Sequence, residues 1–157
     1  MKHITKVHDQ TVFGTTLTDD NELQFVAQAN KTYGLHFDLV NSSDDVADLN
    51  GRVIFAVNAP SGSVVNAYCF ALVGNGTTAP TQGPLTPVTQ GEPGSWFGFG
   101  APGCEDSPAY AWVRIAAQVT TGDVPGVVGL QFSEYADVDD SEGAVIYAGS
   151  SLFVTKG

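Results

Sequence analysis

Residues 17–40, LTDDNELQFVAQANKTYGLHFDLV, contain the alternating pattern that decides the fold. The apolar members of its two alternating runs are Leu23, Phe25 and Ala27, then Tyr33, Leu35, Phe37 and Leu39. Successive side chains of a strand point to opposite faces, so each run predicts a strand with one buried face. The residues between the runs, Ala29-Asn30-Lys31, suit a tight antiparallel link because asparagine tolerates left-handed backbone angles. We therefore predict a hairpin on which the rest of the chain packs.

The rest of the chain is a succession of short apolar or alternating runs, each bounded by turn residues. These runs are 11–17, 52–58, 63–73, 109–119, 126–135, 144–148 and 151–155, the last two joined or bent at Gly149. A helix is a second interpretation for 109–119, where alanines are frequent. About eight strands spaced by turn signals, without a convincing helix, indicate an all-β protein built as an antiparallel β-sandwich or barrel.

The length and composition predict a single domain with one unusual segment. A chain of 157 residues can bury a hydrophobic core large enough to be stable without disulfide bonds or a structural metal. The polar residues 1–10 are expected to form an N-terminal arm, and 11–157 the domain. Within it, 74–108 holds six of the eight prolines and eight of the eighteen glycines, but no Lys or Arg. We expect a long Gly/Pro-rich insertion there, with a short strand around Trp96–Phe99.

The charge balance excludes several classes of partner. The net charge is −11 and only six residues are Lys or Arg, so contact with nucleic acid phosphates or an anionic membrane surface is not expected. Charged residues make up 15% of the chain, against about 25% in typical domains. Such a chain keeps part of its surface neutral, which favours burial against another subunit.

Sequence features of targeting and redox chemistry are sparse. The start, MKHITKVHDQ, lacks the apolar core of a signal peptide, and no apolar run approaches the length of a membrane span. We therefore expect synthesis in the cytoplasm. Cys69 lies in an apolar run and is expected to be a buried free thiol, although a disulfide with Cys104 stays open.

No catalytic signature is present, so we predict no enzymatic activity and no cofactor. The chain has no G-x-S-x-G elbow and no glycine loop that cradles phosphates. His3 and His8 are terminal, and His36 is expected on the polar face of its strand. The best metal candidate is an acidic loop whose carboxylates, suited to Ca²⁺, are Asp137, Asp139, Asp140 and Glu142. Its glycine falls one place late for an EF-hand and position 148 is alanine, so a solvated loop without metal is the simpler interpretation.

Two groups of residues are candidates for contact with partners. The first is the basic start of the chain, where Lys2, His3, Lys6 and His8 form either a solvated, frayed terminus or an arm that docks on an acidic surface. The second is an aromatic group that either fills the core or a subunit interface, or stacks on sugars, and it consists of Trp96, Phe97, Phe99, Tyr110 and Trp112.

Three short motifs stand out along the chain. These are a T-x-L-x-x-D-x-x-L run at Thr16–Leu23 with the acid at Asp19 or Asp20, an A-N-x-T-aromatic turn at Ala29–Tyr33, and an A-G-S-x-L-x-V tail at Ala148–Val154. Together they resemble motifs of small structural proteins of tailed bacteriophages. The resemblance covers about two thirds of the chain and leaves out 74–108. Some members of that group resemble trimeric jelly-roll decoration proteins on the outside of capsids.

The resemblance implies a jelly-roll-like homotrimer that binds the major capsid protein on the outer surface of the head and stabilises it. No catalytic residue is implied. Closed symmetric assembly would bury neutral surface, in keeping with the low charge content. The alternative function is a tail-fibre or tail-tip module that binds a receptor or glycan through the loop around Trp96–Phe99.

Overall fold

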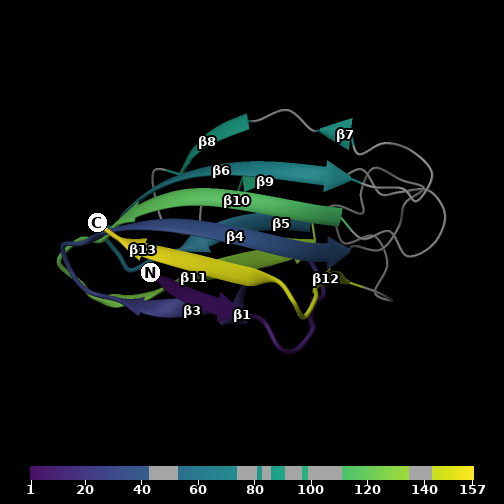
Figure 1. The fold of residues 1–157 in the computed structure, drawn as a ribbon, viewed down its shortest axis with the longest axis horizontal. Helices are drawn as coiled ribbons and strands as arrows, with labels where there is room; N and C mark the ends of the chain where they lie inside the picture. Colours follow the sequence, from purple (N-terminus) through teal and green to yellow (C-terminus); the bar gives the residue numbers. More distant parts are fainter. Residues whose placement is uncertain (43–52, 74–80, 83–85, 91–96, 99–110, 135–142) are drawn as a thin grey trace.

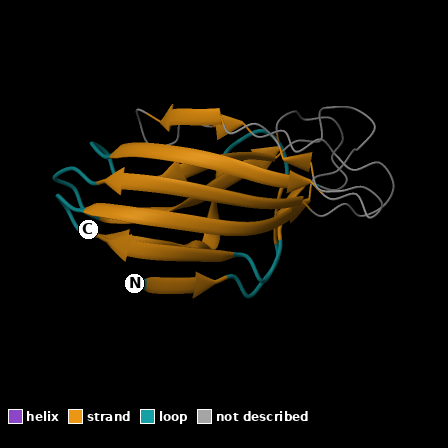
Figure 2. Cartoon of the chain, turned by 45° about the horizontal axis from the view of Figure 1, so that its top comes forward, coloured by secondary structure: helices purple, strands orange, loops and turns teal. Residues whose placement is uncertain are grey.

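The computed structural model describes residues 1–42, 53–73, 81–82, 86–90, 97–98, 111–134 and 143–157. These residues form strands and turns, without a helix (Figure 2). The strands are β1 (Lys2–Thr5), β2 (Gln10–Val12), β3 (Thr18–Ala27), β4 (Thr32–Ser42), β5 (Val53–Asn58), β6 (Val64–Val73), β7 (Thr81–Gln82), β8 (Thr86–Gln90), β9 (Phe97–Gly98), β10 (Ala111–Thr120), β11 (Gly126–Glu134), β12 (Ala144–Ile146) and β13 (Ser151–Lys156). The all-β antiparallel sandwich predicted from the sequence is confirmed.

The strands form two sheets that lie one in front of the other (Figure 1). The large sheet has the order β1-β13-β4-β10-β6-β7, with β8 also paired to β6 and with β12 joining β2 to β4. The small sheet has the order β3-β11-β5-β9. Between them lies one hydrophobic core to which both sheets contribute.

The pairing of eight of these strands is that of a jelly roll. Taken in chain order, the eight are β3, β4, β5, β6, β8, β9, β10 and β11. The first pairs with the eighth, the second with the seventh, the third with the sixth and the fourth with the fifth. Every connection except that from β6 to β8 crosses from one sheet to the other. This is the order of a long hairpin rolled into two sheets, the jelly roll implied by the sequence resemblance.

The two strands of the alternating stretch form as predicted, but the hairpin between them is wrong. β3 lies in the small sheet and pairs with β11, whereas β4 lies in the large sheet between β13 and β10. The turn at Asn30 is present, with a φ of 54° in the left-handed region. Because β3 and β4 belong to different sheets, this turn links the two sheets. A local alternation of apolar residues predicts a strand and its buried face, but not the strand beside it.

The core is made from the alternating residues of both sheets. Leu23 and Ala27 of β3 are fully buried, and so are Leu35, Phe37 and Leu39 of β4. Each large apolar side chain buried in this way contributes roughly 1.5–3 kcal/mol. Within the run at 109–119, residues 111–119 lie in strand β10 and not in a helix, and Val113, Ile115, Ala117 and Val119 fall on its one buried face.

The segment 74–108 contributes three short strands to the described part of the fold. β9 confirms the short strand expected around Trp96–Phe99, and it pairs with β5. β8 pairs with β6 and contains Pro87 opposite Tyr68. Proline lacks an N–H donor and is tolerated at the edge of a sheet, which is where β8 lies. Two of the eight strands of the jelly roll therefore come from the expected insertion.

The start of the chain also belongs to the sandwich. β1 pairs with β13 in the register Lys2 to Val154 through Thr5 to Ser151 and forms one edge of the large sheet (Figure 1). Lys6 continues this attachment, because its N–H donates to Ser150 O at 2.8 Å and its carbonyl accepts from Gly149 N at 2.9 Å. Residues 2–5 of the predicted N-terminal arm therefore form an edge strand of the large sheet.

Candidate functional site

The four basic candidates at the start of the chain have different environments. Lys2, His3 and His8 are exposed. The ring of His3 stacks on Phe153 of β13, with ring centroids 4.3 Å apart and planes 4° from parallel. Lys6 is 2% exposed and is not available to a partner. The docking assignment is therefore corrected for Lys6, while Lys2, His3 and His8 keep the exposure that docking requires.

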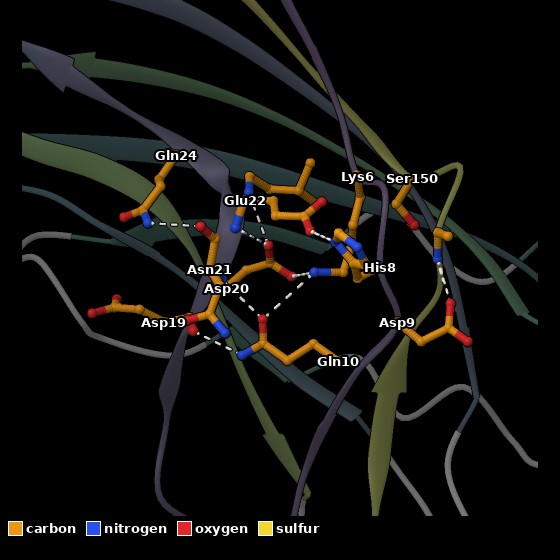
Figure 3. Close-up of polar contacts among 12 residues, drawn as sticks. Lys6, His8, Asp9, Gln10, Asp19, Asp20, Asn21, Glu22, Gln24 and Ser150 are labelled. Atoms are coloured by element: carbon orange, nitrogen blue, oxygen red, sulfur yellow. Dashed lines mark hydrogen bonds and ion pairs between the residues drawn. The ribbon is translucent and has the colours of Figure 1, made fainter.

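Lys6 is buried because a carboxylate inside the sandwich matches its charge (Figure 3). Its Nζ lies 2.8 Å from Asp20 Oδ2, and the Asp20 side chain is fully buried. The other oxygen of Asp20 accepts from the backbone N–H groups of Glu22 at 2.9 Å and Leu23 at 2.8 Å. Gln10 Oε1 is 3.5 Å from the same Nζ. A charged pair can stay buried only when its members are paired and hydrogen-bonded in this way.

Further polar contacts fasten the segment after β1 to the body of the fold (Figure 3). Glu22 accepts from the backbone N–H of Val7, and its Oε1 lies 2.8 Å from His8 Nδ1. These two hydrogen bonds hold the pKa of Glu22 below its ordinary value of 4.5, and the bond from the Val7 backbone has the larger effect. Asp9 Oδ1 accepts from Ala148 N at 2.7 Å. We call the contacts made by residues 6–10 the N-terminal clamp, and its role is to hold β1 in place.

The acidic residues of β3 do not form a metal site. Asp20 faces Lys6, and Glu22 faces Val7 and His8. Asp19 Oδ1 accepts from Asn58 Nδ2 at 3.0 Å, on β5. Within the residues that the structure describes, no group of three or more His, Cys, Asp or Glu is placed to hold a metal ion. The acidic loop at Asp137, Asp139, Asp140 and Glu142 lies outside the described residues.

Of the aromatic candidates, only Trp112 has a described side chain. It is 37% exposed on the outer face of β10, and the Arg114 guanidinium carbon lies 4.9 Å from the centroid of its ring. Arg114 Nε also donates to Asp38 Oδ1 of β4 at 2.6 Å, a hydrogen bond that raises the pKa of the arginine. The structure does not describe the other aromatic candidates, which are Trp96, Phe99, Tyr110 and the ring of Phe97. The same is true of the side chain of Cys69 and of all of Cys104.

The large sheet places five residues in one row across its outer face. In register order they are Tyr68, Ala116, His36, Phe153 and His3, from β6, β10, β4, β13 and β1. We call this the aromatic row. The sequence predicted His36 on a polar face, which is confirmed by its exposure. It could not predict the row, because its members come from five strands spread over 150 residues.

An apolar pair is exposed on the outer face of the small sheet. Val26 of β3 is 77% exposed, and its cross-strand partner Val127 of β11 is 45% exposed. Val124, in the turn that leads into β11, is also exposed. We call these three residues the valine patch. The signal in the sequence was Val26, an apolar residue at a polar position of an alternating strand.

Comparison with family models, with curated proteins and with solved structures found no match to this chain. A search of the described residues for a helix long and apolar enough to cross a membrane likewise found none.

Proposed function

We propose that this chain is a non-enzymatic decoration protein of a tailed bacteriophage, which binds as a homotrimer to the outer surface of the assembled head. The support comes from the resemblance of its sequence motifs to phage structural proteins. A jelly-roll order of strands is in keeping with that resemblance. The observation that carries the proposal in the structure is the exposed, uncharged valine patch on a chain of charge −11.

The valine patch is suited to burial in a permanent contact. Isolated exposed apolar residues are common, but Val26 and Val127 are cross-strand neighbours and expose a joint apolar surface. Val124, Val26 and Val127 bring no charge, so their burial against a shell costs no desolvation of ions. A ligand that binds only the assembled shell stabilises that shell by mass action.

Binding to empty heads, assembled from the major capsid protein encoded with this chain, tests the proposal. The wild-type chain should co-sediment with these heads and raise their thermal transition. Val127→Lys should weaken binding at least tenfold, because it places a charge in the buried contact. Val64→Lys is the matched control, since Val64 is 51% exposed at the start of β6 in the other sheet. No binding of the wild-type chain, or equal loss in both variants, would count against the proposal.

The basic residues at the start of the chain need a more selective test than truncation. Deletion of residues 1–8 would remove β1 and Lys6, leaving the buried carboxylate of Asp20 without its partner. Lys2→Glu changes only an exposed side chain outside the N-terminal clamp. If these residues dock on an acidic capsid surface, this variant should bind heads more weakly than the wild type at low salt. The difference in affinity should become smaller at high salt, where the charges are screened.

A further inference from the structure

We infer that the outer face of the large sheet is a binding site for a neutral saccharide, centred on Ala116 between Tyr68 and His36. The inference goes beyond the proposed attachment to a capsid and does not depend on it. The site lies on the opposite side of the sandwich from Val26 and Val127, so either activity can be lost without the other.

The shape of the site follows from the register of three strands. Ala116 of β10 is directly opposite Tyr68 of β6 on one side and His36 of β4 on the other. Neighbouring strands are about 4.8 Å apart, so the backbones that carry the tyrosine and the histidine are roughly 10 Å apart. Alanine has the shortest side chain of the row, and Tyr68, which is 50% exposed, stands beside it. A flat ring can therefore lie over Ala116 with a face against Tyr68.

Polar groups surround this position and have hydrogen-bonding capacity to spare. Arg114 and Gln118 lie two residues before and after Ala116 on the same face of β10. Arg114 donates to Asp38 through Nε, so the terminal amino groups of its guanidinium remain as donors for a ligand. The side chains of His36, Tyr68 and Gln118 are exposed. Among the described residues, none of the three is recorded in a side-chain hydrogen bond. Hydroxyl groups at the rim of a sugar ring would meet donors and acceptors on three sides.

The charge of this face selects a neutral ligand. Among the described strand residues that face outward from the large sheet, Asp38 and Arg114 are the formally charged ones, and they are paired at 2.6 Å. The whole chain carries a charge of −11, which repels sulfated or phosphorylated ligands. Aromatic faces contact apolar ring faces, and the mixture of aromatic and polar side chains matches a sugar better than a continuous apolar partner.

The test is to titrate the full chain with cellohexaose, maltohexaose and mannohexaose. Binding is measured by calorimetry and by changes in amide chemical shifts. At least one of these oligosaccharides should bind saturably and shift the amides of Tyr68, Ala116 and His36. Tyr68→Ala, which removes the stacking ring, and Ala116→Gln, which occupies the centre, should each raise the Kd at least tenfold. Phe13→Ala is the matched control, because Phe13 is an exposed aromatic residue (59%) outside the site. Its affinity should equal that of the wild type.

Three results would overturn the inference. The first is that none of the three oligosaccharides binds, and the second is that the shifts fall outside the aromatic row. The third is a concentration-dependent dimer, measured by sedimentation, that Ala116→Gln separates, because it would assign this face to a second copy of the chain. Tyr68→Ala alters an exposed side chain, so it remains informative even if Ala116→Gln does not fold.

Discussion

The buried ion pair of Lys6 and Asp20 is the single-residue feature with the largest expected consequence. Two charges withdrawn from water are costly unless each has its partner, and here the pair is completed by the backbone N–H groups of Glu22 and Leu23. A lysine is almost never fully buried without such a partner. From the sequence alone, a basic residue at position 6 therefore indicates surface, and the partner 14 residues later gives no local signal.

Removal of one member of this pair should be more harmful than removal of both. Lys6→Met leaves the Asp20 carboxylate buried without a counter-ion, and we expect it to lower the free energy of unfolding by about 3–5 kcal/mol. The double variant Lys6→Met, Asp20→Asn should recover part of this loss. Urea denaturation of the four proteins of the double-mutant cycle measures the coupling. Additive losses would mean that the pair has no net interaction.

Glu22 should make the N-terminal clamp sensitive to acid. Its pKa in the folded protein lies below 4.5, because Val7 N–H and His8 bond its charged form. A lowered pKa contributes stability above the unfolded value, and this is lost as the pH falls through the folded pKa. The amide protection of Val7 against hydrogen exchange should therefore decline below pH 4.5. Glu22→Gln should have weaker protection at neutral pH and lose this pH dependence, whereas an unchanged profile would contradict the assignment.

At the scale of elements, the turn between β3 and β4 is one of the links that join the two sheets. Asn30 N donates to Gly122 O at 2.9 Å, and Thr121 N donates to Lys31 O at 2.9 Å. The Thr121 hydroxyl donates to Gln28 O at 2.7 Å and accepts from Lys31 N at 3.0 Å. This turn is therefore tied to the turn between β10 and β11, which also joins the two sheets.

Substitution of Asn30 should separate backbone geometry from side-chain contacts. Its φ of 54° is unfavourable for a β-branched residue, so Asn30→Val should lower the free energy of unfolding by about 1–2 kcal/mol. Asn30→Gly adopts the same angle freely and should change stability by much less. Thermal unfolding followed by circular dichroism compares the two. Equal losses would show that the asparagine side chain, and not the left-handed backbone, is what matters.

At the scale of the whole molecule, the two outer faces of the sandwich have different characters. The small sheet exposes the valine patch, and the large sheet exposes the aromatic row with the Asp38–Arg114 pair. A jelly roll separates these faces by the thickness of one core, about 10 Å between the sheets. One face can thus be committed to assembly while the other stays accessible to solvent.

The oligomeric state is the property of the whole molecule that bears most directly on the proposed function. Light scattering should give a solution mass of three times 16.4 kDa for a stable trimer. Val127→Lys should reduce this mass if the valine patch lies between copies of the chain, and should leave it unchanged if the patch faces the capsid. A monomeric wild-type chain would weaken the model of a decoration protein at three-fold positions.

The alternation of Tyr33, Leu35, Phe37 and Leu39 was enough to predict strand β4 and its buried face. The run at 126–135 likewise predicted β11, in which Val128, Leu130 and Phe132 are buried. These predictions succeed because the period of a strand is a local property of the chain. The left-handed residue at Asn30 was also local, and it too was predicted.

Only the tertiary structure decided which strands became neighbours. The alternation around Asn30 is equally compatible with a hairpin and with a link between sheets, and the pairing of β3 with β11 and of β4 with β10 selects the latter. The buried Lys6 and the aromatic row depend on the same choice, since each joins residues from different strands. The physical reason is that burial of one face is encoded within a strand, whereas pairing depends on the free energy of the complete two-layer core.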